Sequence, residues 1–558
     1  MKCKGGKTGD MVDVILGSRQ LGLLARLTTN NYKRERTMSL SSLDITTFIV
    51  YCVLLISIAW WVSREKRDHQ KTSEDYFLAG KSLPWWAIGA SLIAANISAE
   101  QIIGMSGSGF VIGLAIASYE WMAAITLLIV GKYLLPIFLK KGIYTMPQFL
   151  EQRYDHRVRT IMAIFWLGVY TLVNLTAVLY LGALAIKTLT GVDMIYGLFF
   201  LAIFSMSYSI YGGLKAIALT DIIQVVMLVF GGLLVSYIAL NRVSDGDGVL
   251  QGIFLLMAEM PEKFTMILDR SSPHYADLPG ISVLIGGLWI MNLSYWGFNQ
   301  YITQRALAAK SLAEAQKGIA FAAYLKLLMP VIVVLPGIAA AMLAPEIGRP
   351  DQAYPEMMKL VPQGLLGISF AALVAAIASS LGSMSNSIST IFTMDIYRQL
   401  INRHASEKRT VWIGRLAAVT AMTIAMIVAE PLLGQMDQAF QYIQEFTGFF
   451  TPGIVAIFLL GFFWKRATAT SALAAAISSA VLSILFKVFW PELPFMDRIG
   501  AVFLLCIAIA VIITLLTGSR VQPNAIDLDD IDFSTSGSFN MLAIGVCLIL
   551  IALYASWW

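Results

Sequence analysis

Hydrophobic residues along this chain of 558 residues fall into long runs that are separated by mostly short polar connections. A run of about 20 apolar residues is long enough to cross a bilayer as an α-helix. Such runs are centred near residues 54, 96, 126, 172, 202, 230, 292, 330, 380, 420, 451, 478, 507 and 548. This pattern predicts an all-α polytopic membrane protein with about 14 transmembrane helices.

The composition of the chain agrees with this prediction. Hydrophobic residues make up 58% of the sequence and charged residues only 13%, whereas soluble domains are roughly half apolar and about a quarter charged. The net charge of +5 is small, and neither the cysteines nor the histidines have the spacing of a metal site. We therefore expect a multi-pass protein of the cell membrane, embedded in the lipid bilayer, that is not an enzyme and binds no nucleic acid.

The distribution of Lys and Arg predicts the orientation of the chain. Basic residues are concentrated in alternate connections, including residues 64–81, 132–159 and 398–415. Because connections rich in Lys and Arg stay in the cytoplasm, both termini are predicted on the outside. The basic N-terminal tail, residues 1–43, conflicts with this orientation. Two interpretations stay open, a true translation start at Met38 and a disordered basic tail.

Polar and ionisable residues interrupt several of the apolar runs. They are Glu100, Gln101, Glu120, Asn174, Asn292, Lys326, Gln444 and Glu445. Any one of them could join two helices by a hydrogen bond, but ionisable residues inside spans usually mark a substrate or ion pathway. Since Glu120 and Lys326 offset each other's charge and no unpaired Arg lies in a span, we expect a neutral cavity for an uncharged solute with many hydroxyl groups. Tyr119, Tyr295 and Trp296 would supply its aromatic faces.

Two runs have the composition of interrupted helices, because Ser, Asn and Gly favour turns over continuous helix. The two segments are AANISAEQ (94–101) and NLSYWGFNQ (292–300). Breaks in corresponding spans of two halves are typical of transporters built from inverted repeats. Unwound carbonyl groups at such a break can coordinate a hard cation, and the hydroxyls of Ser379 and Ser380 would face them. A Ser–Ser pair in a membrane helix more often serves packing, so both interpretations stay open.

Six fragments of the sequence carry a family resemblance. They are EDYFLAGKSLPWW, AANISAEQ, ASYEWM, YGGLKA, YWGFNQY and FQYIQE. From about residue 44 to residue 558 the chain resembles the sodium/solute symporter family, and within it most closely the bacterial sodium/galactose branch. The resemblance implies a LeuT-type core of two inverted five-helix repeats at residues 84–241 and 280–465. An extra first helix at 44–63 would precede this core, and additional helices at 467–558 would follow it.

The resemblance also implies site residues. Substrate contacts would come from Gln101, Glu120, Asn292, Lys326 and Gln444, and the same region would be lined by Asn96, Ser98, Glu100 and Trp296. Tyr295 would stack on a sugar ring as the inner gate, and the outer gate would consist of Met105, Tyr119 and Phe440. A co-transported sodium ion would be held by the carbonyls of Ala94, Ile97 and Ala376 and the hydroxyls of Ser379 and Ser380. Asn174 would brace the break in the second run, and Asp221 would lie on the inward exit of the ion.

One residue departs from the pattern of the sodium/galactose branch. There the segment SYEWMS ends in a serine that contacts the sugar, whereas this chain has Ala123 in SYEWMA. The resemblance implies sodium-coupled import of a neutral sugar of the galactose or glucose type. The alternatives are a sodium symporter for another neutral polyol, such as inositol, and a membrane solute sensor.

Overall fold

The structure is a computed structural model, and it describes residues 40–63, 72–434, 439–518 and 520–558. Met38 and nearly all of the predicted tail at residues 1–43 lie outside these ranges. Within them the chain is helical and contains no β-strand, only one isolated bridge between Leu83 and Ala309. The predicted all-α class is therefore confirmed for the described part.

The first half of the chain contributes seventeen elements. They are α2 (Ser42–Ser63), α3 (Ser73–Leu78), η1 (Ala79–Lys81), α4 (Trp85–Asn96), η2 (Glu100–Met105), α5 (Ser106–Val111), η3 (Leu114–Ala117), α6 (Ser118–Ile129), η4 (Val130–Leu134), α7 (Leu135–Lys141), α8 (Met146–Arg153), α9 (His156–Val169), η5 (Tyr170–Leu175), α10 (Thr176–Thr190), α11 (Met194–Val243), α12 (Val249–Glu259) and η6 (Pro261–Phe264). Of the short elements, η2, η4 and η5 are single π-helical stretches inside longer spans. Such stretches are frequent at functional sites.

The second half contributes fourteen elements. They are α13 (Ile281–Ile285), α14 (Gly287–Phe298), α15 (Gln300–Leu307), α16 (Leu312–Leu343), η7 (Pro350–Gln352), α17 (Ala353–Met358), α18 (Leu366–Ile391), η8 (Phe392–Ile401), α19 (Glu407–Leu433), α20 (Ala439–Gly448), α21 (Thr451–Phe463), α22 (Ala469–Phe489), α23 (Phe495–Leu516) and α24 (Gly537–Trp557). Several of these helices begin at a side-chain cap. The Ser311 hydroxyl accepts a hydrogen bond from the Glu314 N–H, and the Ser536 hydroxyl accepts one from the Phe539 N–H, which satisfies donors that the first turn leaves free.

Ten helices in the described ranges are long and apolar enough to cross a membrane, and the bent pair of α4 with η2 and α5 would make an eleventh. The predicted number of 14 is not confirmed. The runs near residues 202 and 451 correspond to the shorter apolar helices Met194–Ser207 and Thr451–Phe463, and α14 ends after 12 residues. In α11, Gly213 adopts φ 61° and ψ −159° and divides the helix. A Cβ there would lie 2.4 Å from the Tyr76 carbonyl oxygen, so this kink requires glycine.

Both predicted helix breaks are confirmed. The helices on the two sides of the first break are bent by 62°, and Ile97 between them is extended, with φ −75° and ψ 102°. The Ser98 hydroxyl accepts from the Glu100 N–H at 3.1 Å, and the Gln101 side-chain oxygen accepts from the Ser98 N–H at 3.1 Å. These side chains replace backbone hydrogen bonds that the helix has lost, as Ser and Gln do at caps.

The second break lies at Asn299, between α14 and α15, where the backbone is extended with φ −88° and ψ 123°. The Tyr170 hydroxyl donates to the Asn299 side-chain oxygen at 2.6 Å and accepts from the Gln300 N–H at 2.8 Å. A side chain of η5 thus satisfies the backbone at this break, which apolar surroundings require.

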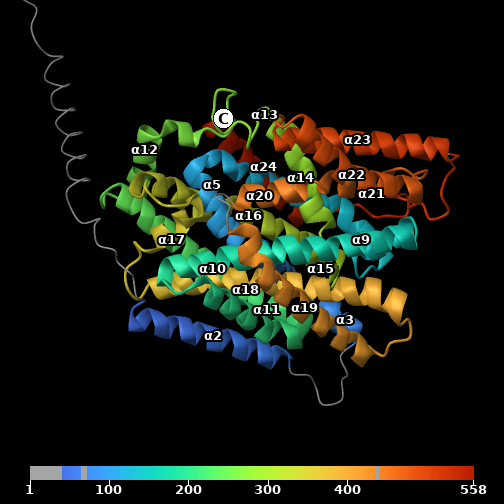
Figure 1. Ribbon diagram of the computed structural model, residues 1–558, viewed down its shortest axis with the longest axis horizontal. Helices are drawn as coiled ribbons and strands as arrows, with labels where there is room; N and C mark the ends of the chain where they lie inside the picture. Colours follow the sequence, from blue (N-terminus) through green and yellow to red (C-terminus); the bar gives the residue numbers. More distant parts are fainter. Residues whose placement is uncertain (1–39, 64–71, 435–438, 519) are drawn as a thin grey trace, which may run out of the picture. The chain divides into compact units, whose positions relative to one another are not determined.

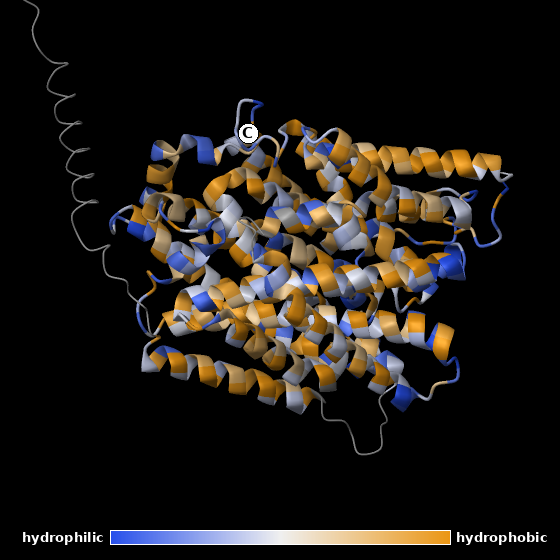
Figure 2. Ribbon diagram, viewed as in Figure 1, coloured by the Kyte–Doolittle hydropathy of each residue, from blue (hydrophilic) through white to orange (hydrophobic). Residues whose placement is uncertain are grey.

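The helices form one bundle over residues 40–558, with the most buried helix at its centre. Figure 1 shows α10, α11 and α18 side by side, with α2 along their outer side and α22 beside α23 at the opposite edge. The best membrane-spanning window of α18 and η8 is 94% buried, against 17% for α2. Figure 2 shows α23 almost entirely hydrophobic and α2 hydrophobic over much of its length, whereas the inner helices mix polar and apolar residues. Apolar residues therefore face outward to lipid, and polar residues are enclosed.

Candidate functional site

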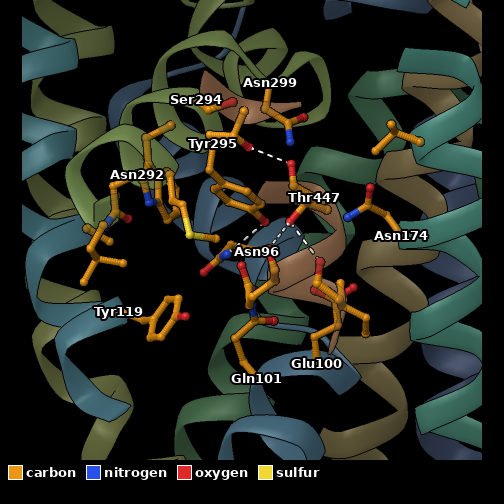
Figure 3. Close-up of a pocket in the computed structure, with 18 of the residues that line it drawn as sticks. Asn96, Glu100, Gln101, Tyr119, Asn174, Asn292, Ser294, Tyr295, Asn299 and Thr447 are labelled. Atoms are coloured by element: carbon orange, nitrogen blue, oxygen red, sulfur yellow. Dashed lines mark hydrogen bonds between the residues drawn. The ribbon is translucent and has the colours of Figure 1, made fainter. Parts of the chain in front are cut away.

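A cavity of about 110 Å³ lies at the first helix break, between α6, α14, α16 and α20. The predicted site residues that line it are Asn96, Glu100, Gln101, Met105, Tyr119, Glu120, Asn174, Asn292, Tyr295, Trp296, Lys326, Phe440 and Gln444. Figure 3 shows ten of the lining residues converging on this space from several helices. Residues separated by more than 300 positions in the sequence are therefore brought together.

The charged part of the wall is the pair of Lys326 on α16 and Glu120 on α6. The Lys326 Nζ donates to Glu120 Oε2 and to the Asn96 side-chain oxygen. It also lies 5.0 Å from the centroid of the Trp296 ring. The lysine is 1% exposed and the glutamate 4%. The predicted mutual compensation of these two charges is confirmed, and it leaves hydrogen-bonding groups with no net charge in this part of the wall.

Tyr295 links the two broken helices across the cavity. Its hydroxyl accepts a hydrogen bond from the Asn96 side-chain N–H at 2.9 Å and another from the Tyr301 hydroxyl at 2.6 Å. The Trp296 ring stands edge-on to the Tyr295 ring, with 5.2 Å between the centroids. The position at the junction of α4, α14 and α15 fits the predicted inner gate, which stays a prediction.

The opposite side of the cavity is closed by aromatic side chains. The rings of Tyr119 on α6 and Phe440 on α20 meet edge to face, with centroids 5.3 Å apart. Met105 lines the cavity beside them, and Phe440 is 1% exposed. The three predicted outer-gate residues are thus together in one wall, and their role as a gate stays a prediction.

Three further predicted residues differ in how they meet the cavity. Ser98 is buried but is not part of the lining, and its hydroxyl donates to the Gln101 side-chain oxygen at 2.9 Å. Glu100 does line the cavity, and its Oε1 has no hydrogen-bonding partner among the described residues. Asn174 reaches the wall from the π-helical stretch η5. Ala123, the residue that departs from the family pattern, lies in the wall as well.

Glu445 is a polar residue that sequence reasoning grouped with the cavity and that the structure places elsewhere. Its carboxylate forms ion pairs with Arg498 of α23 at 2.6 Å and with Lys487 of α22 at 3.0 Å. The neighbouring Gln444 does line the cavity. Successive residues of a helix point about 100° apart, so only one of the two can face inward.

The residues predicted to hold sodium lie where the first break meets α18. The Ser380 hydroxyl lies 3.4 Å from the Ala94 carbonyl oxygen and 3.0 Å from the Ala95 carbonyl oxygen, and Ile97 begins the unwound segment. Ala376 precedes Ser380 by one helical turn on α18. Ser379 is fully buried, and its hydroxyl donates to Asp221 at 2.5 Å. Carbonyl and hydroxyl oxygens at such a point are the ligands that a hard monovalent cation takes in place of water.

Arg305 is a buried residue that sequence reasoning missed as part of the site, because it was counted with the basic connections. It is completely buried on α15. Its Nε donates to the Ser91 carbonyl at 3.0 Å and to the Ser91 hydroxyl at 2.8 Å, and its Nη2 lies 3.5 Å from Asp221. Asp221 therefore belongs to an enclosed network. The polar residues of QYITQRAL, directly after the second break, are the sequence signal for it.

The chain is similar to membrane transporters of known families. The model described as the sodium:solute symporter family matches residues 76–478. A sodium/glucose cotransporter of Vibrio parahaemolyticus is 51% identical over 537 residues, covering 93% of this chain and 99% of that relative. The human sodium/myo-inositol cotransporter 2 is 32% identical over 471 residues, covering 79% of this chain and 69% of that relative.

Among solved structures, a Na+-coupled sialic acid symporter in a substrate-bound outward-open state matches with a TM-score of 0.75. The match covers 86% of this chain and 99% of that one, at 23% sequence identity. At this level of sequence identity, the likeness shows a shared fold and nothing more.

Proposed function

Because the chain belongs to the sodium:solute symporter family, we propose that it imports a neutral hexose of the galactose or glucose type together with sodium. The observation that carries the proposal is the cavity whose wall combines amides, aromatic rings, one neutralised ion pair and the Glu100 carboxyl. Such a wall offers donors and acceptors to sugar hydroxyls and a ring face for stacking, and its Lys326–Glu120 pair carries no net charge.

We also propose the finer architecture. The first inverted repeat occupies residues 84–241 and the second residues 280–465, so that the breaks at Ile97 and Asn299 are equivalent positions of the two repeats. The extra helix precedes this core, and the helices of residues 467–558 follow it. Both termini face outward, as the distribution of Lys and Arg predicts. Breaks of this kind place the substrate and ion sites at the midplane of the membrane.

The proposed cycle begins when sodium enters from outside. It binds between the carbonyls at the end of α4 and the Ser380 hydroxyl, and it thereby holds α4 against α18. This favours the outward-open state, because sodium has a higher affinity for it than for the inward-open state. Sugar then binds beside Gln444 and Tyr295, and the side chains of Tyr119 and Phe440 close over it. The core rocks to face inward, sodium leaves first, and the sugar follows.

Coupling to sodium supplies the energy for accumulation. Each ion that moves inward across about 100 mV contributes roughly 2.3 kcal/mol, and a tenfold sodium gradient adds about 1.4 kcal/mol. Together these support an accumulation of sugar of roughly a few hundred-fold for each coupled ion.

The second candidate substrate is a cyclic polyol such as inositol. Two observations favour keeping it: the similarity to the sodium/myo-inositol cotransporter, and Ala123 in the cavity wall, where the sodium/galactose branch has a serine. Loss of one hydroxyl from the wall changes which substrate hydroxyls find a partner, and this alters preference among solutes of similar shape.

The proposal is tested by uptake of labelled galactose and glucose into proteoliposomes, with and without an inward sodium gradient. We expect concentrative uptake of one of them that requires sodium. Gln444→Ala should lower this uptake about tenfold or more, because removing one hydrogen-bonding partner from a buried site costs about 1–3 kcal/mol. Arg398→Gln, in a partly exposed pair with Glu407 at 3.6 Å, is the matched control and should transport normally. Uptake of inositol in place of either hexose would select the second candidate, and no sodium-dependent uptake would contradict both.

A further inference from the structure

A row of polar side chains runs along one face of α18 from Ser379, while Ser385 and Ser387 point to other sides of the same helix. Ser379, Ser383, Asn386 and Thr390 follow one another at intervals of four, three and four residues, which places them on the same side of the helix. Ser389 lies beside them, and Thr393 follows it by four residues in η8, the π-helical stretch that continues α18. We name this set the α18 stripe: Ser379, Ser383, Asn386, Ser389, Thr390 and Thr393.

Three members of the stripe are buried without a partner. Both polar atoms of the Asn386 side chain and the hydroxyls of Ser389 and Thr393 have no hydrogen bond to any described residue, and these residues are 5%, 1% and 0% exposed. An unsatisfied buried polar group costs about 1–3 kcal/mol. Proteins therefore satisfy such groups with ordered water or an ion. The stripe thus presents three side chains that make no hydrogen bond within the described part of the chain.

The Ser379 end of the stripe lies next to the residues proposed to bind sodium. Ser379 donates to Asp221, and Ser383 accepts from Arg305 while donating to the Ser379 carbonyl. The Arg305 charge is offset by Asp221 at 3.5 Å. Because this pair is neutral overall, it leaves no net positive charge at the start of the stripe that would repel a cation.

An aromatic side chain lies near the Thr393 end of the stripe. Phe77 is completely buried and packs in an apolar cluster with Tyr76 and Val411. Phe77 and Thr393 both approach Gly414. A Cβ atom added to this glycine would lie 3.4 Å from the Phe77 ring and 3.1 Å from the Thr393 hydroxyl. The Gln304 side chain bridges the two elements, since it donates both to the Phe77 carbonyl at 2.5 Å and to the Thr390 hydroxyl at 3.2 Å.

We propose that the α18 stripe is the path by which hydrated sodium leaves the site at Ser380, and that Phe77 closes its inner end. This inference rests on the proposed function and deepens it, because it assigns Asn386, Ser389 and Thr393 as groups that contact the leaving ion. Their oxygens replace part of the hydration shell of sodium at successive positions, and movement of Phe77 away from Gly414 opens the path.

The path is tested by separating net transport from binding. Net uptake requires that sodium be released inside, whereas binding of labelled sugar to the purified protein at saturating sodium does not. In proteoliposomes of the full chain, Asn386→Leu should lower net uptake about tenfold, the effect of about 1.4 kcal/mol on a barrier. The sugar affinity should stay within about twofold of wild type. A loss of both uptake and affinity, or of neither, would overturn the inference.

Two further variants keep this test sharp. Thr393→Val changes a single group and preserves the shape of the side chain, so it carries the same expectation if Asn386→Leu does not fold. The matched control is Ser369→Ala, which removes a buried hydroxyl of α18 that also lacks a partner among the described residues but lies on the other side of Ser379 along the helix. It should leave both net uptake and sugar affinity unchanged, and an equal loss of net uptake in this control would contradict the assignment.

The closing role of Phe77 is tested with sodium alone, so that the result does not depend on the identity of the sugar. Proteoliposomes loaded with labelled sodium and free of sugar should lose it about tenfold faster with Phe77→Ala than with wild type, because opening the path removes a barrier of about 1.4 kcal/mol. Adding Asn386→Leu to Phe77→Ala should slow this loss again. If Phe77→Ala leaves sodium efflux unchanged, the path is wrong, even where sodium-driven sugar uptake upholds the proposed function.

Discussion

The structure contains two buried pairs of a cation and a carboxylate that have similar chemistry and different surroundings. Lys326 with Glu120 borders the cavity, whereas Arg305 with Asp221 is enclosed on all sides, with both side chains 0% exposed. The donors of Arg305 are taken up by Ser91, Tyr301, Ser383 and Asp221. Lys326 instead has open space and the Trp296 ring beside it. A buried pair next to open space can contact a ligand, and a buried pair whose hydrogen bonds are all internal holds helices together.

The largest expected effect is on stability, at the enclosed pair. Arg305→Met leaves Asp221 without its cation, and breaking a buried pair in this way costs about 3–5 kcal/mol. We expect a marked fall in the apparent melting temperature of the purified protein. The double variant Arg305→Met with Asp221→Asn should recover much of it, since no uncompensated charge then remains. A melting temperature equal to that of wild type for the single variant would contradict the structural role of this pair.

Disruption of the pair at the cavity should affect sugar uptake more than stability. In Lys326→Met the remaining Glu120 borders the cavity, so water can solvate it, and the loss of stability should be smaller than in Arg305→Met. Sugar uptake should fall at least tenfold, because a buried charged donor contributes about 1.5–3 kcal/mol. Adding Glu120→Gln should restore the melting temperature but not the uptake. Restoration of uptake by the double variant would show that the pair serves only packing.

The smallest expected effect concerns the choice of sugar. Ala123→Ser adds a hydroxyl to the cavity wall and should change the ratio of galactose to glucose uptake by roughly fivefold, the effect of about 1 kcal/mol from one hydrogen bond. Competition between the two sugars in the same preparation measures this ratio directly. Total uptake by the variant should stay near that of wild type, and an unchanged ratio would place specificity elsewhere in the wall.

The sequence alone predicts the pair of Glu120 and Lys326, because a charged side chain in an apolar run is stable only beside an opposite charge or water. Glu120 and Lys326 must either compensate each other or contact water, so their pairing follows from their position in two spans. The two helix breaks are predictable for a similar reason, because clusters of Ser, Asn and Gly in apolar runs disfavour continuous helix. In the second break, however, the residue in extended conformation is Asn299, seven positions beyond Asn292.

The features that could not be predicted depend on the direction in which a side chain points and on how deeply it is buried. Gln444 and Glu445 are adjacent polar residues, and only packing against α22 and α23 decides that the glutamate turns away from the cavity. Arg305 lies close to the basic connection at Lys310, and the sequence does not indicate that α15 ends inside the bundle. Beyond the Ser379–Ser380 pair, the polar residues of α18 gave no separate signal in the sequence, and their missing partners among the described residues become visible only in three dimensions.

The central claim is that sodium at Ser380 and sugar in the cavity bind as a coupled pair. It is tested most directly by measuring the affinity of the purified protein for labelled galactose or glucose, whichever it imports, at increasing sodium concentrations. The account predicts that saturating sodium tightens sugar binding about 5–150-fold, the range of a coupling free energy of about 1–3 kcal/mol. It also predicts that Ser380→Ala removes most of this effect and leaves the affinity without sodium unchanged. Sugar affinity that is independent of sodium in the wild-type protein would contradict the account.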